Sequence, residues 1–160
     1  MPLRFATDAD LDTIIALIRG LAAFEREPEA VTLDREELRQ HLFGPRPYAE
    51  VILAETDAGA TAGFALFFHN FSTWVGKPGI YLEDLFVREE FRGRGFGRAL
   101  LAELARLAIA RGCARLEWAV LDWNEAAIGF YRSLGAVAMD EWTTYRLQGE
   151  ALAGLAALHD

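Results

Sequence analysis

Apolar residues recur three and four positions apart near the start of the chain, the period of a helix that packs one face against a core. We expect a strand at 3–6 and then this helix, which Thr7 or Asp8 caps. Its buried face comprises Leu11, Ile14, Ile15, Ile18 and Leu21. A shorter helix at 33–42 ends at the breaker cluster Gly44-Pro-Arg-Pro47.

The rest of the chain predicts alternating strands and helices. The expected elements are strands at 51–56, 62–71 and 80–87, a long helix at 95–111, a strand at 116–121, a helix at 124–134 ended by Gly135, a strand at 142–147 and a short helix at 149–158. The turn Asp57-Ala-Gly59 makes the first two strands an antiparallel hairpin. The long helix is a crossover, so strands 80–87 and 116–121 are expected to be parallel within a mainly antiparallel sheet.

Composition limits the classes of function. A chain of 160 residues, 52% of them hydrophobic, fits one domain over 1–160. No apolar run approaches the roughly 20 residues that span a bilayer, and no secretory signal is evident, so we expect a cytoplasmic protein without a membrane partner. The net charge of −8 argues against a nucleic-acid partner. The single cysteine, Cys113, has no clustered Cys or His beside it, and no metal site is expected.

The most informative segment is the strand Tyr81-Leu-Glu-Asp-Leu-Phe-Val87, followed by the loop Arg92-Gly-Arg-Gly-Phe-Gly97 and the long helix. Three glycines let backbone amides approach a ligand closely, and the helix N-terminus and arginines favour an anion such as phosphate. A plain turn is the alternative. The dinucleotide fingerprint does not fit, because Arg98 stands where the third glycine should be, and no Gly-Lys-Ser/Thr motif is present.

The pattern Arg-x-x-Gly-x-Gly, from Arg92 to Gly97, resembles the GNAT superfamily of N-acetyltransferases, whose loop at this point binds the pyrophosphate of acetyl-CoA. A second motif, Asn124-x(5)-Phe-Tyr131-x(3)-Gly135-Ala136, resembles the segment that supports the pantetheine arm. Without the resemblance, Asn124 reads as a helix cap and Tyr131 as a core aromatic. The resemblance implies an α/β (α+β) fold with a twisted, mostly antiparallel sheet of six to seven strands, helices on both faces and one splayed parallel pair.

The resemblance also implies the residues that bind acetyl-CoA. They are Leu85, Phe86, Val87, Arg92, Gly93, Arg94, Gly95, Phe96, Gly97, Arg98, Asn124 and Tyr131. Backbone amides of the strand, at Leu85 and Val87, are expected to bind the thioester carbonyl and the pantetheine.

Further segments resemble the diamine acetyltransferase family over nearly the whole chain: Phe71-Ser-Thr-Trp-Val-Gly76, Ile80-Tyr-Leu-Glu-Asp84, Ala119-Val-Leu-Asp-Trp-Asn124 and Leu147-Gln-Gly-Glu150. Its two branches acetylate polyamines or the ε-amine of thialysine and similar amines. Polyamine enzymes usually carry an acidic residue where this chain has Ser72. The sequence around Trp74 resembles instead the branch that acetylates thialysine. The implied amine-binding residues are Phe24, Glu25, Trp74, Glu83, Asp84, Glu117 and Trp118.

Acetyl transfer to an amine requires two proton transfers. An alkylammonium with a pKa near 10 must lose a proton, and a departing thiolate with a pKa near 8.5 must gain one. We expect Glu83, partly buried on its strand, to be the base through a water molecule, and Tyr131 to be the acid. The alternative for Glu83 is a structural ion pair with an arginine.

The predicted function is therefore acetyl-CoA-dependent N-acetylation of a small cationic amine. Two alternatives remain: acetylation of a protein N-terminus or lysine, and a catalytically silent module that binds acyl-CoA. The resemblance also implies a homodimer, to which Trp142 and Tyr145 of the last expected strand can contribute.

Overall fold

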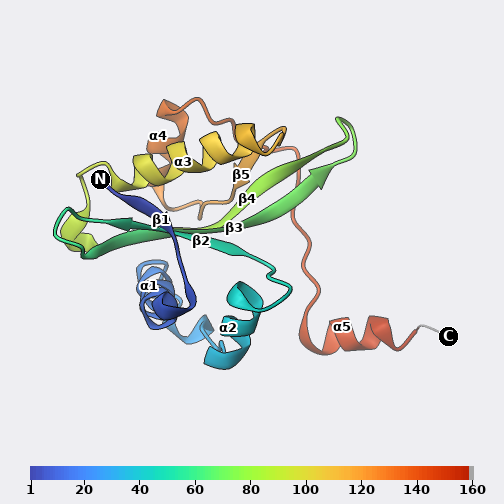
Figure 1. Cartoon of the computed structure of the whole chain (residues 1–160). Coiled ribbons are helices and arrows are strands. Elements are labelled where there is room, and N and C mark those ends of the chain that lie inside the picture. The colour runs from blue at the N-terminus through green and yellow to red at the C-terminus, as the bar shows by residue number, and fades with distance from the viewer. Residues whose placement is uncertain (159–160) are drawn as a thin grey trace. The chain divides into compact units, whose positions relative to one another are not determined.

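A computed structural model describes residues 1–158 (Figure 1). Its strands are β1 (Leu3–Phe5), β2 (Glu50–Glu55), β3 (Thr61–Ser72), β4 (Lys77–Val87) and β5 (Leu116–Trp118). Its α-helices are α1 (Leu11–Phe24), α2 (Arg35–Phe43), α3 (Phe96–Ala110), α4 (Glu125–Ser133) and α5 (Gly149–Ala156). Short 3-10 turns occur at Asp8–Asp10, Pro28–Ala30 and Glu89–Phe91.

The strands form one sheet in the order β1-β2-β3-β4-β5, which is also their order along the chain. All neighbouring pairs are antiparallel except β4 and β5, which are parallel. The predicted hairpin of β2 and β3 and the predicted parallel pair across α3 are thus confirmed. Within residues 1–158 the sheet has five strands, fewer than the six to seven expected.

The missing strand is the one predicted at 142–147, and this prediction was wrong. Trp142 and Tyr145 are exposed, and no residue of the described chain pairs with this segment as a strand. Within this segment the Trp142 amide forms a turn, donating a hydrogen bond to Met139 O at 3.2 Å. Alternating apolar residues favour a strand only where a neighbouring strand supplies hydrogen bonds and covers them, which the described structure does not do here.

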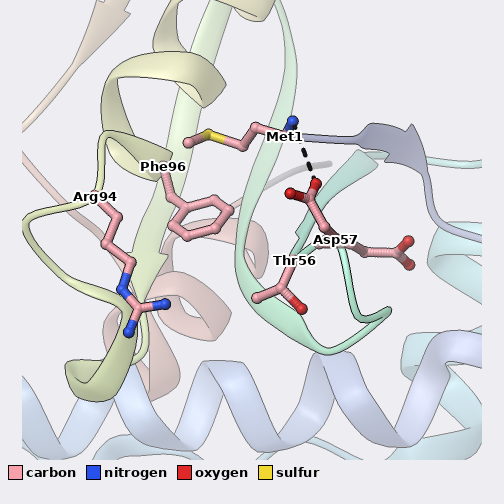
Figure 2. A pocket seen from close by; sticks show the side chains of 6 residues that line it. Met1, Thr56, Asp57, Arg94 and Phe96 are labelled. Atoms are coloured by element: carbon pink, nitrogen blue, oxygen red, sulfur yellow. Dashed lines mark ion pairs between the residues drawn. The ribbon is translucent and has the colours of Figure 1, made fainter.

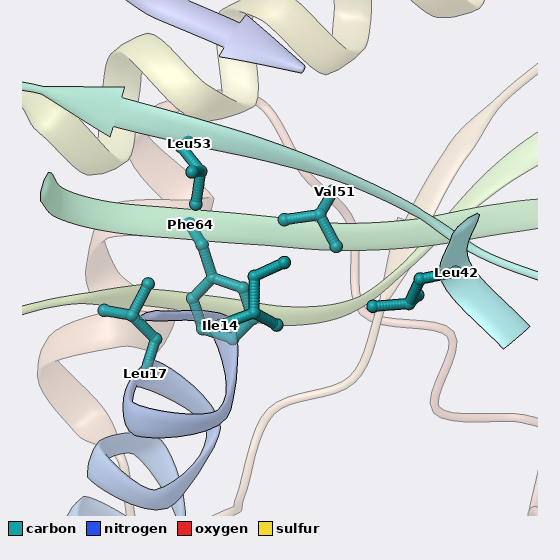
Figure 3. Packing of buried hydrophobic residues seen from close by; sticks show 6 residues of the cluster. All are labelled: Ile14, Leu17, Leu42, Val51, Leu53 and Phe64. Atoms are coloured by element: carbon teal, nitrogen blue, oxygen red, sulfur yellow. The ribbon is translucent and has the colours of Figure 1, made fainter. Parts of the chain in front are cut away.

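Helices α1 and α2 cover one face of the sheet (Figure 1). The core on this face consists of side chains that are almost completely buried, and Figure 3 shows them pointing toward one another from both helices and from two strands. They are Ile14, Leu17, Leu42, Val51, Leu53 and Phe64. Leu11 and Ile14 are buried as predicted, whereas Ile15 and Ile18 are only half-buried.

Helix α3 lies on the other face of the sheet (Figure 1). Its predicted inward face is confirmed, because Leu100, Leu104, Leu107 and Ala108 are all buried. These contacts hold the N-terminus of α3 in a fixed position just beyond the C-terminal end of β4, as a crossover helix requires.

The chain divides into two compact units, Met1–Leu121 and a second that begins at Asp122. The first contains the whole sheet with α1, α2 and α3. In the second, α4 ends as predicted at Gly135, whose φ is +88° and whose amide donates to Arg132 O at 3.0 Å. Helix α5 confirms the predicted C-terminal helix. That the whole chain is one domain stays a prediction.

Candidate active site

Strand β4 changes its register against β3 at Glu83. Leu66 lies opposite Asp84, and the next residue of β3, Phe67, lies opposite Leu82, so Glu83 has no partner on β3. This is a β-bulge, in which one strand carries an extra residue and its side-chain alternation shifts by one position. Bulges commonly re-aim a side chain beside a functional site.

The bulge turns Asp84 toward the face of the sheet that α1 covers. Phe86 lies opposite Phe64 and packs against the core beneath α1. Asp84, two residues before Phe86, shares that face. Leu82, on the other side of the bulge, is buried on the face toward α3. Without the bulge, regular alternation would have placed Asp84 on the same face as Leu82.

Strands β4 and β5 separate immediately after this point. They pair only from Ile80 to Leu82, and in residues 1–158 no strand pairs with β4 on that side beyond Leu82. The Arg88 amide donates to Ala62 O of the β2–β3 side at 2.8 Å, so the alternate residues Leu85 and Val87 direct their backbone groups toward the open side. This opening is a slot in which an extended ligand can pair with the strand.

The glycine loop and the start of α3 follow the open end of β4. Gly93 and Gly95 have φ of +75° and +87°, the left-handed region that glycine adopts without strain. Gly95 is the N-cap of α3, and no side chain of the described residues caps the first turn. The first amides of this 15-residue helix are thus left for an outside acceptor, and the helix dipole favours an anion.

A pocket of about 270 Å³ lies beside the glycine loop (Figure 2). It is lined by Met1, Glu55, Thr56, Asp57, Arg94 and Phe96. Figure 2 shows Arg94 and Phe96 on the loop side, and the carboxylate of Asp57 across from them, paired with the Met1 amino group at 3.8 Å. Phe96 is almost completely buried, whereas the Arg94 guanidinium is exposed.

Three carboxylates gather around the bulge. Burial, and then the negative charges of Glu83 and Glu25, raise the pKa of Asp84 to about 6. Burial also raises the pKa of Glu25, which follows α1. Within residues 1–158 no hydrogen bond or ion pair involves the side chain of any of the three. Half-buried negative charge without a counterion favours a cationic ligand.

Comparison with known proteins supports the same reading. Residues 14–136 match the acetyltransferase (GNAT) family. The chain belongs to this family. It is 38% identical to a thialysine N-epsilon-acetyltransferase of Bos taurus over 96% of each protein, and 33% identical to an L-ornithine N5-acetyltransferase of Arabidopsis thaliana over 98% of this chain and 88% of that one.

The fold agrees with that of a solved structure. An integron cassette protein of V. cholerae is 28% identical and superposes with a TM-score of 0.79, covering 97% of this chain and 96% of that one. The predicted GNAT fold and the resemblance to thialysine acetyltransferases are therefore confirmed. The chain is an N-acetyltransferase, and acetyl-CoA is its cosubstrate.

The residues present in this GNAT enzyme fit acetyl-CoA. The uncapped α3 N-terminus with its two left-handed glycines suits a pyrophosphate, and the open backbone of β4 suits the amide-bearing pantetheine arm. Arg94 and Arg98 are exposed beside the loop. Among the described residues no group of three or more His, Cys, Asp or Glu could hold a metal ion, and no helix is long and apolar enough to span a membrane.

Arg92 is the first residue of the glycine loop, and its side chain contacts β4 and the end of α1. Its Nε donates to Val87 O at 2.9 Å, and its guanidinium lies over the rings of Phe24, at 4.8 Å, and Phe86, at 5.5 Å. Phe24 ends α1, so Arg92 links the loop, the end of β4 and the end of α1. This brings Phe24, Phe86 and Arg92 together around the same end of the sheet as Glu25 and Asp84.

Glu83 is exposed on the bulge, not partly buried as expected. The bulge accounts for the difference, because the extra residue leaves the regular alternation of the strand and has no cross-strand neighbour to cover it. Its alternative role in an ion pair with an arginine is wrong for the described residues, none of which forms such a pair with Glu83.

Glu117 and Trp118 lie on β5 at the start of the opening. Glu117 is already engaged: it pairs with Arg115 Nε at 2.8 Å and accepts a hydrogen bond from Asn70 Nδ2 at 3.0 Å. Asn70 lies 47 residues from Glu117 in the chain and was not predicted as a site residue, because only the pairing of the strands brings the two together. Glu117 therefore has less charge to offer an amine than Asp84 or Glu25.

Trp74 does not join this group within the chain. It occupies the turn between β3 and β4 and is 90% exposed. From Lys77, the first residue of β4, to Glu83 the strand advances six residues, or about 20 Å at the rise of an extended strand. Trp74 thus lies at the tip of a long hairpin, away from the carboxylates of its own chain.

Asn124 and Tyr131 belong to the second unit. Asn124 caps α4, since its Oδ1 accepts from the Ala127 amide at 3.3 Å. Tyr131 lies two turns further along α4, half-buried, with its ring 5.8 Å from that of Phe130. The capping role that the sequence offered for Asn124 is confirmed.

Proposed function

We propose that this N-acetyltransferase acts on a small lysine-like amine, such as thialysine or ornithine, by direct transfer from acetyl-CoA. The observation that carries the proposal is the cluster of Glu25, Glu83 and Asp84, which has no counterion among residues 1–158 and lies beside the opening between β4 and β5. The relatives named for thialysine and ornithine support it. A primary ammonium is a cation of the right size to neutralise such a cluster.

The cosubstrate is held by backbone groups more than by side chains. The amides of Leu85 and Val87 bind the pantetheine and the thioester carbonyl, on which negative charge develops during transfer. The amides from Gly93 to Gly97 bind the pyrophosphate, with Arg94 and Arg98 adding positive charge. Asn124 and Tyr131 contribute from α4.

Two side chains serve the two proton transfers. Glu83, beside the thioester end of the opening, draws a proton from the ammonium through a water molecule. The neutral amine forms the C–N bond, and the C–S bond breaks. Tyr131 donates its phenolic proton to the departing sulfur, for which a phenol pKa of about 10 is well matched.

The proposal includes a homodimer in the cytoplasm. Trp74 resembles an amine-site residue but lies about 20 Å along the hairpin from the carboxylates of its own chain. Both observations are accounted for if the hairpin tip reaches the amine site of a second subunit. Phe71 and Val75, which are also exposed near this tip, would then be covered.

Thiol release from acetyl-CoA, measured with thialysine, lysine, ornithine, spermidine, putrescine and an N-terminal peptide, tests this function. We expect kcat/KM to be at least about tenfold higher for thialysine or ornithine than for spermidine. Highest activity on the peptide would favour a protein acetyltransferase. Acetyl-CoA binding without turnover on any amine would favour the silent module.

A matched variant sharpens the test of substrate class. Ser72 stands where polyamine enzymes usually carry an acid, so Ser72→Asp should raise kcat/KM for spermidine relative to thialysine, and Ser72→Asn should not. If both variants leave the spermidine ratio unchanged, Ser72 does not select the substrate.

A further inference from the structure

We propose that the proton drawn from the substrate ammonium ends on Asp84, with Glu83 serving to hold the water that passes it on. This inference rests on the proposed function, acetyl transfer to a small cationic amine. It divides between two neighbouring carboxylates a role that the sequence assigns to Glu83 alone, and it makes Asp84 a catalytic residue as well as a binding one.

The bulge gives the two carboxylates different surroundings. Glu83 is the extra residue and is exposed, whereas Asp84 is half-buried on the face covered by α1. A proton acceptor is more effective when its pKa is closer to that of the donor. The pKa of Asp84, raised from 3.8 to about 6, favours the proton transfer by a factor of about 100 over an ordinary aspartate.

The groups around Asp84 account for this environment. Glu25 approaches from the end of α1, and Glu83 precedes Asp84 on β4. On β3 the residue opposite Asp84 is the apolar Leu66. The positive charge of Arg92 is directed to the rings of Phe24 and Phe86, and does not pair with Asp84 in the described structure.

The balance of protons is complete. The ammonium gives one N–H proton through the water to Asp84, the nitrogen lone pair forms the C–N bond, and the C–S bond breaks as the sulfur takes the proton of Tyr131. The second N–H proton, lost as the amide forms, restores Tyr131 through solvent. Asp84 then releases its proton to water, so that one proton is released for each amide formed.

The pH dependence of kcat/KM for thialysine tests the assignment, with Asp84→Asn and Glu83→Gln as matched isosteric variants. For the wild type we expect an acid limb near pH 6. Asp84→Asn should lose at least about 100-fold in kcat and lose this limb, because the variant can use only amine that is already neutral. Glu83→Gln should be slower but keep the limb, and Glu25→Gln should move the limb to lower pH.

A second substrate separates a chemical role from a structural one. An amine of lower pKa is neutral in a larger fraction, so the loss caused by Asp84→Asn should shrink as the pKa of the amine falls, whereas a merely misfolded site would lose activity equally on all amines. The proposal is overturned if the acid limb persists in Asp84→Asn and disappears in Glu83→Gln.

A measurement without turnover separates this proposal from the proposed function. The carboxyl carbons of the wild-type aspartates, followed by NMR against pH, should show one that titrates near pH 6 and is absent from Asp84→Asn. Lysine at saturating concentration should lower that pKa, because a bound cation favours the carboxylate. Titration of Asp84 in the ordinary aspartate range overturns the inference whatever the enzyme acetylates, while absence of turnover on every amine overturns only the proposed function.

Discussion

Arg92 Nε donates a hydrogen bond of 2.9 Å to the backbone oxygen of Val87, which joins the glycine loop to the last residue of β4. The bond occupies an acceptor on the open side of β4 and leaves the neighbouring amides for a ligand. The same guanidinium lies over Phe24 and Phe86. One side chain thus sets the distance between the two parts of the protein proposed to hold the cosubstrate, the strand and the loop.

Arg92→Lys should weaken both of these functions. Lysine cannot keep the Nε bond and the planar stack together, so we expect a loss of about 1 kcal/mol in the free energy of unfolding and a KM for acetyl-CoA raised about tenfold. Urea denaturation and thiol-release kinetics measure the two effects. Arg94→Lys is the control: Arg94 is exposed on the loop, and this variant should change KM while leaving stability within about 0.5 kcal/mol. Equal stability of the two variants would show that the Arg92 contacts are not structural.

Gly95→Ala tests the left-handed cap of α3. An added Cβ would meet only the Met1 Cε, at 3.9 Å, so the cost arises from the backbone at φ +87° and should be about 1–2 kcal/mol. We expect lower stability in urea and a raised KM for acetyl-CoA as the loop shifts. Gly97→Ala, in the same helix without a positive φ and with its nearest contact at 3.9 Å, should be neutral or stabilising by up to about 1 kcal/mol. A similar loss in both variants would contradict a conformational cause.

A substitution in the core between α1 and the sheet should lower the free energy of unfolding more than the loop substitutions do. Phe64 is fully buried at the centre of that core, and Phe64→Ala should cost about 3–5 kcal/mol in urea unfolding because it removes apolar burial and leaves a cavity. Ile109→Ala, at an 81% exposed site on α3, should change stability by less than about 0.5 kcal/mol. A small loss at Phe64 would mean that this core is not packed as described.

Local sequence patterns were enough to predict the elements that depend mainly on residues close to one another in the chain. The buried face of α3, the hairpin turn at Gly59 and the end of α4 at Gly135 all follow from periodicity and glycine placement, and the structure has them. The parallel pairing of β4 and β5 followed from the length of the crossover helix between them. The glycine loop was recognisable for the same reason, since its contacts are local.

Features that depend on a second strand were not predictable in this way. The bulge at Glu83 is a property of the register between β3 and β4. Because of it, Glu83 is exposed and Asp84 is half-buried, whereas Glu83 was expected to be partly buried. The hydrogen bond from Asn70 on β3 to Glu117 on β5 also joins residues of different strands. At 142–147 the strand pattern was present, but no strand within residues 1–158 pairs with this segment. A sequence pattern describes one strand, whereas a site on a sheet depends on two.

Asp84→Asn should stabilise the protein at high pH while it lowers activity. The pKa of Asp84 is about 6 in the folded protein, above the ordinary value of 3.8, so the folded state binds more protons than the unfolded state between these values. The contribution of Asp84 to stability therefore falls as pH rises through this window and stays low above it. Asparagine carries no charge at either extreme, and the variant should gain about 1–2 kcal/mol over the wild type at about pH 8.

Urea denaturation of both proteins at about pH 8 and about pH 4 checks this sign. Near pH 4 the folded wild type already holds Asp84 protonated, so the gain should largely disappear there. Glu25→Gln, which removes one of the charges acting on Asp84, should recover part of the gain at the higher pH. A gain of equal size at both pH values would mean that asparagine merely packs better. A gain confined to high pH would show that the folded enzyme keeps a carboxylate at a cost in stability, as expected for a group retained to bind a cation and accept its proton.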